Sequence, residues 1–265
     1  MRTSKSSQKT ELRAFIAEEL ARETFPEAVE FAEEIGRRPG VVAVLFYGSC
    51  LQRGTTEGML DFYALTEGDG AYGQSKLIEL AGRILPPNVY PETIDGIRAK
   101  VAVAPLSEFH RRMAVERRDT TFWARFCQRS ALLWVADDAA REAAVESVAS
   151  AVETASIWAE RLSDGAEGAA AWRALFARTY RIEIRVEPPS RAADIVGAEP
   201  ERWDALWPMT ADVRAEAGPA GFRAWAARWW VGKALHLSRL AKGAATFEGG
   251  ARYLIWKIRR HLKRS

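Results

Sequence analysis

Residues 41–66 constrain the fold of this chain more than any other segment. Val41 to Phe46 form an uninterrupted apolar run, which is typical of a buried β-strand. Tyr47-Gly48-Ser49 and a polar loop follow, and a second apolar run occupies residues 59–66. The segment therefore predicts a strand, a tight turn, the start of a helix and a second strand.

A single carboxylate, Asp61, lies inside the second apolar run. A carboxylate in such surroundings is unfavourable unless a partner compensates its charge, and the usual partner is a metal ion. Gly48 lets the backbone approach a phosphate closely, and amides at the start of the next helix would face that anion. The hydroxyl of Ser49 can bind a phosphate oxygen or a metal-bound water. These residues suit a phosphate group and a metal ion.

This arrangement resembles the nucleotidyltransferases of the DNA polymerase beta type, whose Gly-Ser turn holds phosphates and whose strand carboxylates hold magnesium. Asp61 follows Gly48 by 13 residues, which is within the spacing of that superfamily. The superfamily has two acids in an Asp-x-Asp pattern, but here Met59 and Tyr63 flank Asp61 at that distance. Either residue could replace the missing acid, and Glu67, Asp69 and Asp95 are the candidates for a second metal ligand.

Hydrophobic periodicity predicts the remaining elements. Helices are expected over residues 10–23, from Pro26 to near Gly40, and over 74–85, and a third strand over 99–104. No comparable strand pattern follows residue 105. Helices are therefore expected over 107–134, 136–162, 166–186, 190–205 and 220–242.

The predicted fold class is α/β (α+β), a nucleotidyltransferase domain with a small mixed sheet followed by an all-helical C-terminal domain. The expected parts are a nucleotidyltransferase domain over 1–107, a helical domain over 108–248 and a basic amphipathic helix over 249–265. The 265 residues are enough for one large or two small domains. The formal net charge of +3 is too small to indicate a polyanion-binding protein, so no nucleic-acid partner is expected. The sequence does not indicate an oligomeric state.

Ordered short segments resemble the mitochondrial translocator assembly and maintenance protein family, the peripheral phosphatidate cytidylyltransferases. That family lacks the second acid two residues after the first, as this chain does. The matching segments are Tyr47-Gly48-Ser49, Met59-Leu60-Asp61-Phe62, Leu85-Pro86-Pro87-Asn88-Val89-Tyr90, Lys100-Val101-Ala102-Val103, Phe126-Cys127-Gln128-Arg129, Tyr180-Arg181-Ile182-Glu183-Ile184-Arg185, Asp194-Ile195-Val196, Lys242-Gly243 and Tyr253-Leu254-Ile255-Trp256-Lys257. The chain departs from the family at Gln128 and Ile182, which replace glycines, and it is shorter between residues 205 and 235.

The resemblance implies that CTP and phosphatidate react to give CDP-diacylglycerol and pyrophosphate. It implies that Asp61 holds Mg²⁺ and that Tyr47, Gly48 and Ser49 bind the nucleotide. Lys100 and Arg129 are the further catalytic candidates, because cations neutralise phosphate charge. Glu183 and Arg185 are expected at the substrate phosphate. The alternatives are that Arg129 is a helix-surface cation and that Glu183 and Arg185 are a solvated pair.

The C-terminal segment 251–265 is basic and contains no acid, and its apolar residues recur at helical spacing. Such a helix suits an anionic membrane surface, with Trp256, Lys257, Arg259 and Arg260 as the expected contacts. Alternatively, this tail docks on its own domain or binds nucleic acid. No apolar stretch reaches the about 18–20 residues that span a bilayer. A peripheral membrane protein is therefore expected, on the cytoplasmic face of a bacterial inner membrane or the matrix face of a mitochondrial one.

Two other function classes remain open from the sequence. One is a nucleotidyltransferase with a soluble acceptor, and the other is a non-catalytic membrane-binding module on a degenerate nucleotidyltransferase fold.

Overall fold

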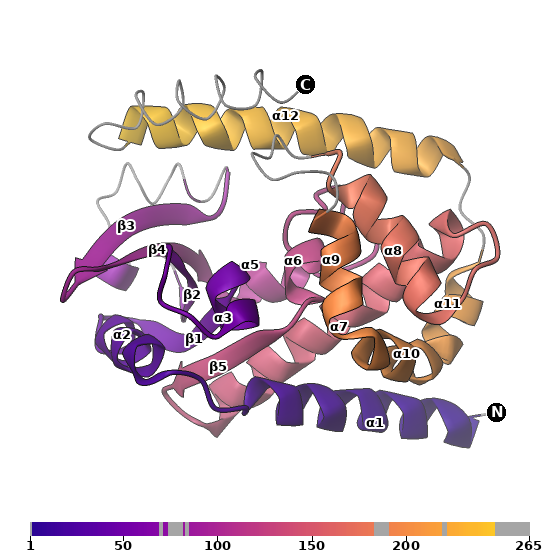
Figure 1. The fold of residues 1–265 in the computed structure, drawn as a ribbon, viewed down its shortest axis with the longest axis horizontal. Coiled ribbons are helices and arrows are strands. Elements are labelled where there is room, and N and C mark those ends of the chain that lie inside the picture. The colour runs from indigo at the N-terminus through magenta and orange to yellow at the C-terminus, as the bar shows by residue number, and fades with distance from the viewer. Residues whose placement is uncertain are drawn as a thin grey trace. The chain divides into compact units, whose positions relative to one another are not determined.

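A computed structural model describes residues 2–68, 71–73, 82, 85–182, 191–218 and 222–246 (Figure 1). A five-stranded mixed sheet lies in the N-terminal half, and a largely helical region follows. The chain divides into two compact units. The sheet unit comprises Arg13–Met113 and Phe126–Ser150, and the helical unit comprises Met1–Leu12, Ala114–Arg125 and Ala151–Ser265. This interleaved division differs from the single boundary after residue 107 that the sequence suggests.

The sheet has the strand order β3-β4-β2-β1-β5 (Figure 1). Strands β2 and β4 are parallel, and the other neighbouring pairs are antiparallel. The strands are β1 (Val41–Tyr47), β2 (Leu60–Thr66), β3 (Asn88–Ile94), β4 (Ile97–Pro105) and β5 (Ser130–Val135). The three predicted strands are confirmed at the positions of β1, β2 and β4, whereas the sequence does not predict β3 and β5.

The predicted helix over 107–134 is wrong. The segment instead contains α5 (Leu106–Arg111), α6 (Trp123–Phe126) and β5. The β5 sequence, SALLWV, is six residues long, and periodicity cannot distinguish so short an apolar run from a helical segment. Pairing with β1, which lies more than 80 residues earlier in the chain, makes it a strand.

One face of the sheet packs on α2 (Pro26–Gly36), which Pro26 begins, as its sequence predicts. The helix before it, α1, spans Arg2–Leu20. Phe62 forms the centre of this core, because its ring lies 5.4 Å from the ring of Phe31 and 5.0 Å from that of Phe46. The buried residues of the core are Ala28, Phe31, Ala32, Ile35, Val41, Val44, Phe46, Cys50, Leu51, Leu60, Phe62, Ala64, Tyr72, Ala99, Val101, Val103 and Ala131.

An aromatic cluster lies on the opposite face of the sheet. The rings of Tyr47, Tyr63, Phe109 and Phe126 lie within contact of one another, with centroid separations of 4.7–6.0 Å. The alternation of side chains along β2 produces both cores, since Phe62 points to one face and Tyr63 to the other. The second core therefore holds α5 and the ring of Phe126 against the sheet.

The helical unit contains the rest of the described helices. They are α7 (Asp138–Leu162, whose first half belongs to the sheet unit), α8 (Gly168–Thr179), α9 (Arg191–Ala198), α10 (Pro200–Met209), α11 (Ala211–Ala217) and α12 (Phe222–Thr246). The predictions for 136–162 and 220–242 are confirmed. The predicted helix over 190–205 is two helices, because Pro200 starts a new one. The C-terminal end of the predicted helix 166–186 and most of 74–85 lie outside the described residues.

Tryptophan rings form much of the core of the helical unit. Trp172 lies 4.9 Å from Trp203, and Trp158 lies 5.4 Å from Trp225. Trp203, Trp207 and Trp225 are buried. Trp230 is exposed on α12. Within the described residues, no helix is both long and apolar enough to cross a membrane.

Replacing Gly36 with alanine tests the packing of α2 on β5. A Cβ atom at Gly36 would lie 2.3 Å from the Trp134 ring on β5. We expect Gly36→Ala to lower the free energy of unfolding by about 1–3 kcal/mol through overpacking, measured by urea denaturation. Gly197→Ala is the control and should be neutral or stabilising, because Gly197 is an exposed position of α9 and a Cβ atom there would have nothing within 4 Å. Equal effects of the two changes would contradict this packing.

Lys242 on α12 gives a pH dependence with a defined sign. Burial, and then the nearby charge of Arg239, lower its pKa to about 8 from 10.5. The unfolded chain thus binds more protons between pH 8 and 10.5, so stability contributed by this group increases with pH across that window. We expect Lys242→Met to stabilise the protein at about pH 7 and to reduce this increase, measured by urea denaturation at about pH 7 and about pH 9.5. An unchanged pH profile would contradict the assignment.

Candidate functional site

The strand register places five residues in one row across the sheet. Tyr47 lies opposite Asp61 on one side and Ser130 on the other, Asp61 lies opposite Lys100, and Lys100 lies opposite Pro91. Side chains in such a row share a face. The next residues along the strands belong to the core on α2, so the row lies on the face of the aromatic cluster.

Asp61 and Lys100 form an ion pair within this row. The Lys100 Nζ lies 3.2 Å from the Asp61 Oδ1, and the side chains of Lys100 and Asp61 are 44% and 23% exposed. Lys100 therefore supplies a positive charge that compensates the strand carboxylate. A pair with this much solvent contact contributes at most about 1 kcal/mol to stability, so its main consequence is to fix where the carboxylate points.

Gly48 brings the turn after β1 against the same carboxylate. Its backbone has φ 90° and ψ −166°, a region that only glycine adopts readily. A Cβ atom there would lie 2.8 Å from the Asp61 Oδ2. Two independent requirements, backbone conformation and space, thus explain the glycine. Gly48, Asp61 and Lys100, which are far apart in the sequence, meet at one point of the sheet.

The helix after the turn, α3, spans only Ser49–Arg53. So short a helix has a small dipole, so the backbone amides of the turn matter more than the helix for an anion. Cys50 anchors the following loop, because its Sγ lies 3.5 Å from the carbonyl oxygen of Met59. Burial raises the pKa of the Cys50 thiol, which makes it a neutral packing group.

A second metal-binding carboxylate is not found near Asp61 among the described residues, in which no group of three His, Cys, Asp or Glu side chains could hold a metal ion. Asp95 lies in the turn between β3 and β4, about 13 Å along the strands from Lys100. Glu67 follows the far end of β2. Tyr63 is buried in the aromatic cluster, Met59 is exposed, and Asp69 lies outside the described residues.

One carboxylate suits a particular kind of magnesium site. Mg²⁺ keeps several waters and is often held by one or two carboxylates together with substrate phosphates. Asp61 is partly exposed beside Gly48, which lacks the Cβ atom that would otherwise approach its Oδ2. These residues fit a magnesium ion that binds together with a nucleotide. They do not by themselves supply a complete set of ligands for the ion.

The other predicted site residues have different outcomes. Arg129 immediately precedes Ser130, so its backbone lies about two strands, or roughly 10 Å, from Asp61. Tyr47 is buried among the rings of Tyr63 and Phe126. Outside the described residues lie Glu183, Arg185, Trp256, Lys257, Arg259 and Arg260.

Ser130 is a residue of the row that the sequence does not reveal. It is 2% exposed, and within the described part of the chain its Oγ has no hydrogen-bond partner. A buried hydroxyl without a partner costs about 1–3 kcal/mol. Its position in the row depends on β5, so only recognition of that strand in the sequence would have placed it beside Tyr47.

No protein-family model and no curated protein matches this sequence. The resemblance to phosphatidate cytidylyltransferases therefore rests on the short segments given above.

Replacing Gly48 with alanine separates the two requirements at the turn. Gly54→Ala is the matched control, because Gly54 has φ 61° but no atom within 4 Å of the place that a Cβ would occupy. We expect Gly54→Ala to cost about 1–2 kcal/mol of unfolding free energy. Gly48→Ala should cost more, since it adds a clash with Asp61 to the backbone strain. Thermal and urea unfolding measure both, and equal losses would contradict the close approach of Gly48 to Asp61.

Proposed function

We propose that this protein transfers a cytidylyl group from CTP to phosphatidate at a membrane surface, giving CDP-diacylglycerol and pyrophosphate. The observation that carries nucleotidyl transfer is the meeting of Gly48, Asp61 and Lys100 at one point of the sheet. The choice of CTP and phosphatidate rests on the sequence resemblance.

In the proposed reaction, a phosphate oxygen of phosphatidate attacks the α-phosphorus of CTP. A new P–O bond forms while the bond between the α-phosphorus and the bridging oxygen breaks, and pyrophosphate leaves with that electron pair. Both reactants are anions, so charge neutralisation dominates the catalytic requirement. The nucleophile is already ionised at neutral pH and needs no strong general base.

The histidines agree with a reaction that needs no such base. The Nδ1 of His110, on α5, lies 3.2 Å from the Ser147 Oγ, and His110 is not part of the row that contains Asp61. His236 is on α12 in the helical unit, and His261 lies outside the described residues.

Each residue of the site has a proposed role. The open backbone at Gly48 and the hydroxyl of Ser49 bind the β- and γ-phosphates. Asp61 would hold the magnesium ion, which would neutralise phosphate charge and polarise the α-phosphorus. Lys100 orients Asp61 and adds a positive charge beside the phosphates. On the resemblance alone, Arg129 is proposed as a further catalytic cation, and Arg185 and Glu183 are proposed at the substrate phosphate.

The proposed membrane contact is the basic segment 249–265, with Trp256, Lys257, Arg259 and Arg260. Its six basic residues between 251 and 265 would each add roughly 1 kcal/mol of attraction to an anionic surface. This places the protein, in our proposal, on the cytoplasmic face of a bacterial inner membrane or the matrix face of a mitochondrial one.

A non-catalytic binding module is the second candidate. The observation that favours it is the single carboxylate of the described site, since the superfamily pattern has two.

Labelled CTP incubated with the protein, Mg²⁺ and phosphatidate liposomes should give labelled CDP-diacylglycerol. We expect Asp61→Asn to lower the rate at least about 100-fold, because it removes the charge that holds the metal. A chelator should abolish the reaction. Asp95→Asn is the matched control, since Asp95 is exposed and has φ 49°, which asparagine tolerates.

The other outcomes identify the alternatives. Magnesium-dependent CTP binding without labelled lipid, but with labelling of a soluble acceptor, would replace phosphatidate with that acceptor class. Vesicle binding without CTP binding would support the non-catalytic module.

A further inference from the structure

Two arginines of the helical unit share one tryptophan ring. The guanidinium carbon of Arg228, on α12, lies 4.0 Å from the centroid of Trp158, and that of Arg161, on α7, lies 4.9 Å from it. Arg228 is only 8% exposed. We call Arg161 and Arg228 the Trp158 arginine pair.

This arginine pair has no carboxylate partner in the described part of the chain. Arg161 donates to the carbonyl oxygens of Ala217 and Gly218, and Arg228 donates to those of Val115 and Ala224. A guanidinium carries five N–H donors, so most donors of the pair have no acceptor among the residues that the structure describes. The buried Nε of Arg228 is one of these.

The charge of Arg228 persists at neutral pH. Burial, and then the charges of Arg161 and Arg118, lower its pKa to about 10. Glu116, which is exposed, is the counter-charge that acts against this shift. Stacking on an aromatic ring offsets only part of the cost of a buried charge. The arrangement is therefore two close cations on which the described carboxylates Glu116 and Glu160 act through their charge, without an ion pair or hydrogen bond.

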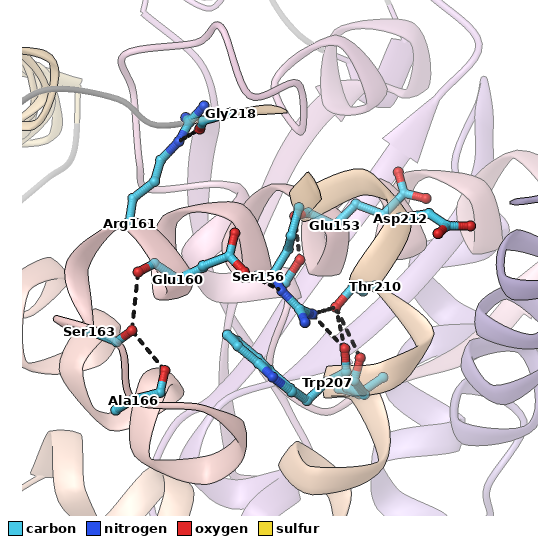
Figure 2. Close-up of polar contacts among 12 residues, drawn as sticks. Glu153, Ser156, Glu160, Arg161, Ser163, Ala166, Trp207, Thr210, Asp212 and Gly218 are labelled. Carbon is cyan, nitrogen blue, oxygen red and sulfur yellow. Dashed lines mark hydrogen bonds and ion pairs between the residues drawn. The ribbon is translucent and has the colours of Figure 1, made fainter. Parts of the chain in front are cut away.

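Arg214 shows how the same unit compensates a buried arginine elsewhere. It stacks 3.7 Å from the Trp207 centroid, and its Nε lies 3.3 Å from the Glu160 Oε1. It also donates to Thr210 Oγ1 at 2.7 Å and to the Trp207 carbonyl oxygen. Figure 2 shows Arg161 directed toward Gly218, well separated in the view from Trp207 and Thr210. Arg214 thus has a carboxylate partner, whereas Arg161 and Arg228 have none among the described residues.

We propose that the Trp158 arginine pair, with Arg118 nearby, binds a phosphate monoester group. Planar guanidinium groups match the oxygens of such an anion in paired hydrogen bonds, and its double negative charge balances two cations. The group belongs either to a lipid headgroup or to a small soluble phosphate. This inference stands on the helical unit alone and does not depend on the proposed cytidylyl transfer.

Titration calorimetry with inorganic phosphate, at constant ionic strength and with chloride as the reference anion, tests the site. We expect saturable binding by the full chain, weakened at least about tenfold in Arg228→Met and in Arg161→Met. Arg161 is less buried than Arg228, so its variant gives a readout even where Arg228→Met fails to fold. Arg214→Met is the matched control, and we expect it to lower stability but retain phosphate binding.

Vesicle sedimentation distinguishes the two sources of the phosphate. Vesicles containing phosphatidate carry a monoester, whereas phosphatidylglycerol carries a diester of lower charge. If Arg161→Met weakens binding only to phosphatidate vesicles, the site binds a lipid headgroup. If it weakens binding only to inorganic phosphate, the site binds a soluble phosphate. Absence of saturable phosphate and phosphatidate binding, or equal binding by wild type and both pair variants, would overturn the proposal.

Discussion

The register between β1 and β2 is the constraint on which the rest of the sheet unit depends. It sets Tyr47 opposite Asp61, and the parallel register of β2 with β4 then sets Asp61 opposite Lys100. A shift of one residue in either pairing would move the carboxylate to the face that packs on α2. Two cores fix the register, because Phe46 and Phe62 must enter one and Tyr47 and Tyr63 the other. The site geometry is therefore a consequence of aromatic packing on both faces of the sheet.

The surroundings of the Asp61 carboxylate come both from the adjacent turn and from a strand more distant in the sequence. Gly48 leaves space beside Asp61, and Lys100 supplies a cation from a strand that pairs on the other side. In the helical unit the charged groups that need partners are arginines. Arg214 has the carboxylate of Glu160, while Arg161 and Arg228 rely on a tryptophan ring and backbone carbonyls. A carboxylate of the sheet unit is thus paired with a lysine, whereas arginines of the helical unit contact a carboxylate, tryptophan rings or backbone carbonyls.

Prediction from the sequence succeeds where a pattern is both local and long. The periodicity of helices α7 and α12, each 25 residues, predicts both, and the proline at its start predicts α2. The strands β1 and β2 and the turn between them follow from apolar runs around Gly48. Strand β5 escapes prediction because its partner β1, far away in the sequence, rather than local preference, determines it. Strand β3 pairs with the adjacent β4 across a two-residue turn, but its sequence contains Pro91 and no apolar run. The meeting of Asp61 with Lys100 depends on the parallel register and cannot be read from spacing, although the sequence points to both residues.

The chain passes between the two compact units near residues 12, 113, 125 and 150. Strand β5 reaches the sheet only after the chain has contributed Ala114–Arg125 to the other unit. A fragment that ended at residue 107 would leave β1 as an unprotected edge, with unpaired amides and carbonyls along an apolar strand. Such an edge promotes intermolecular pairing. During synthesis the first four strands therefore remain open to association until β5 has left the ribosome, and folding of the sheet is tied to the later part of the chain.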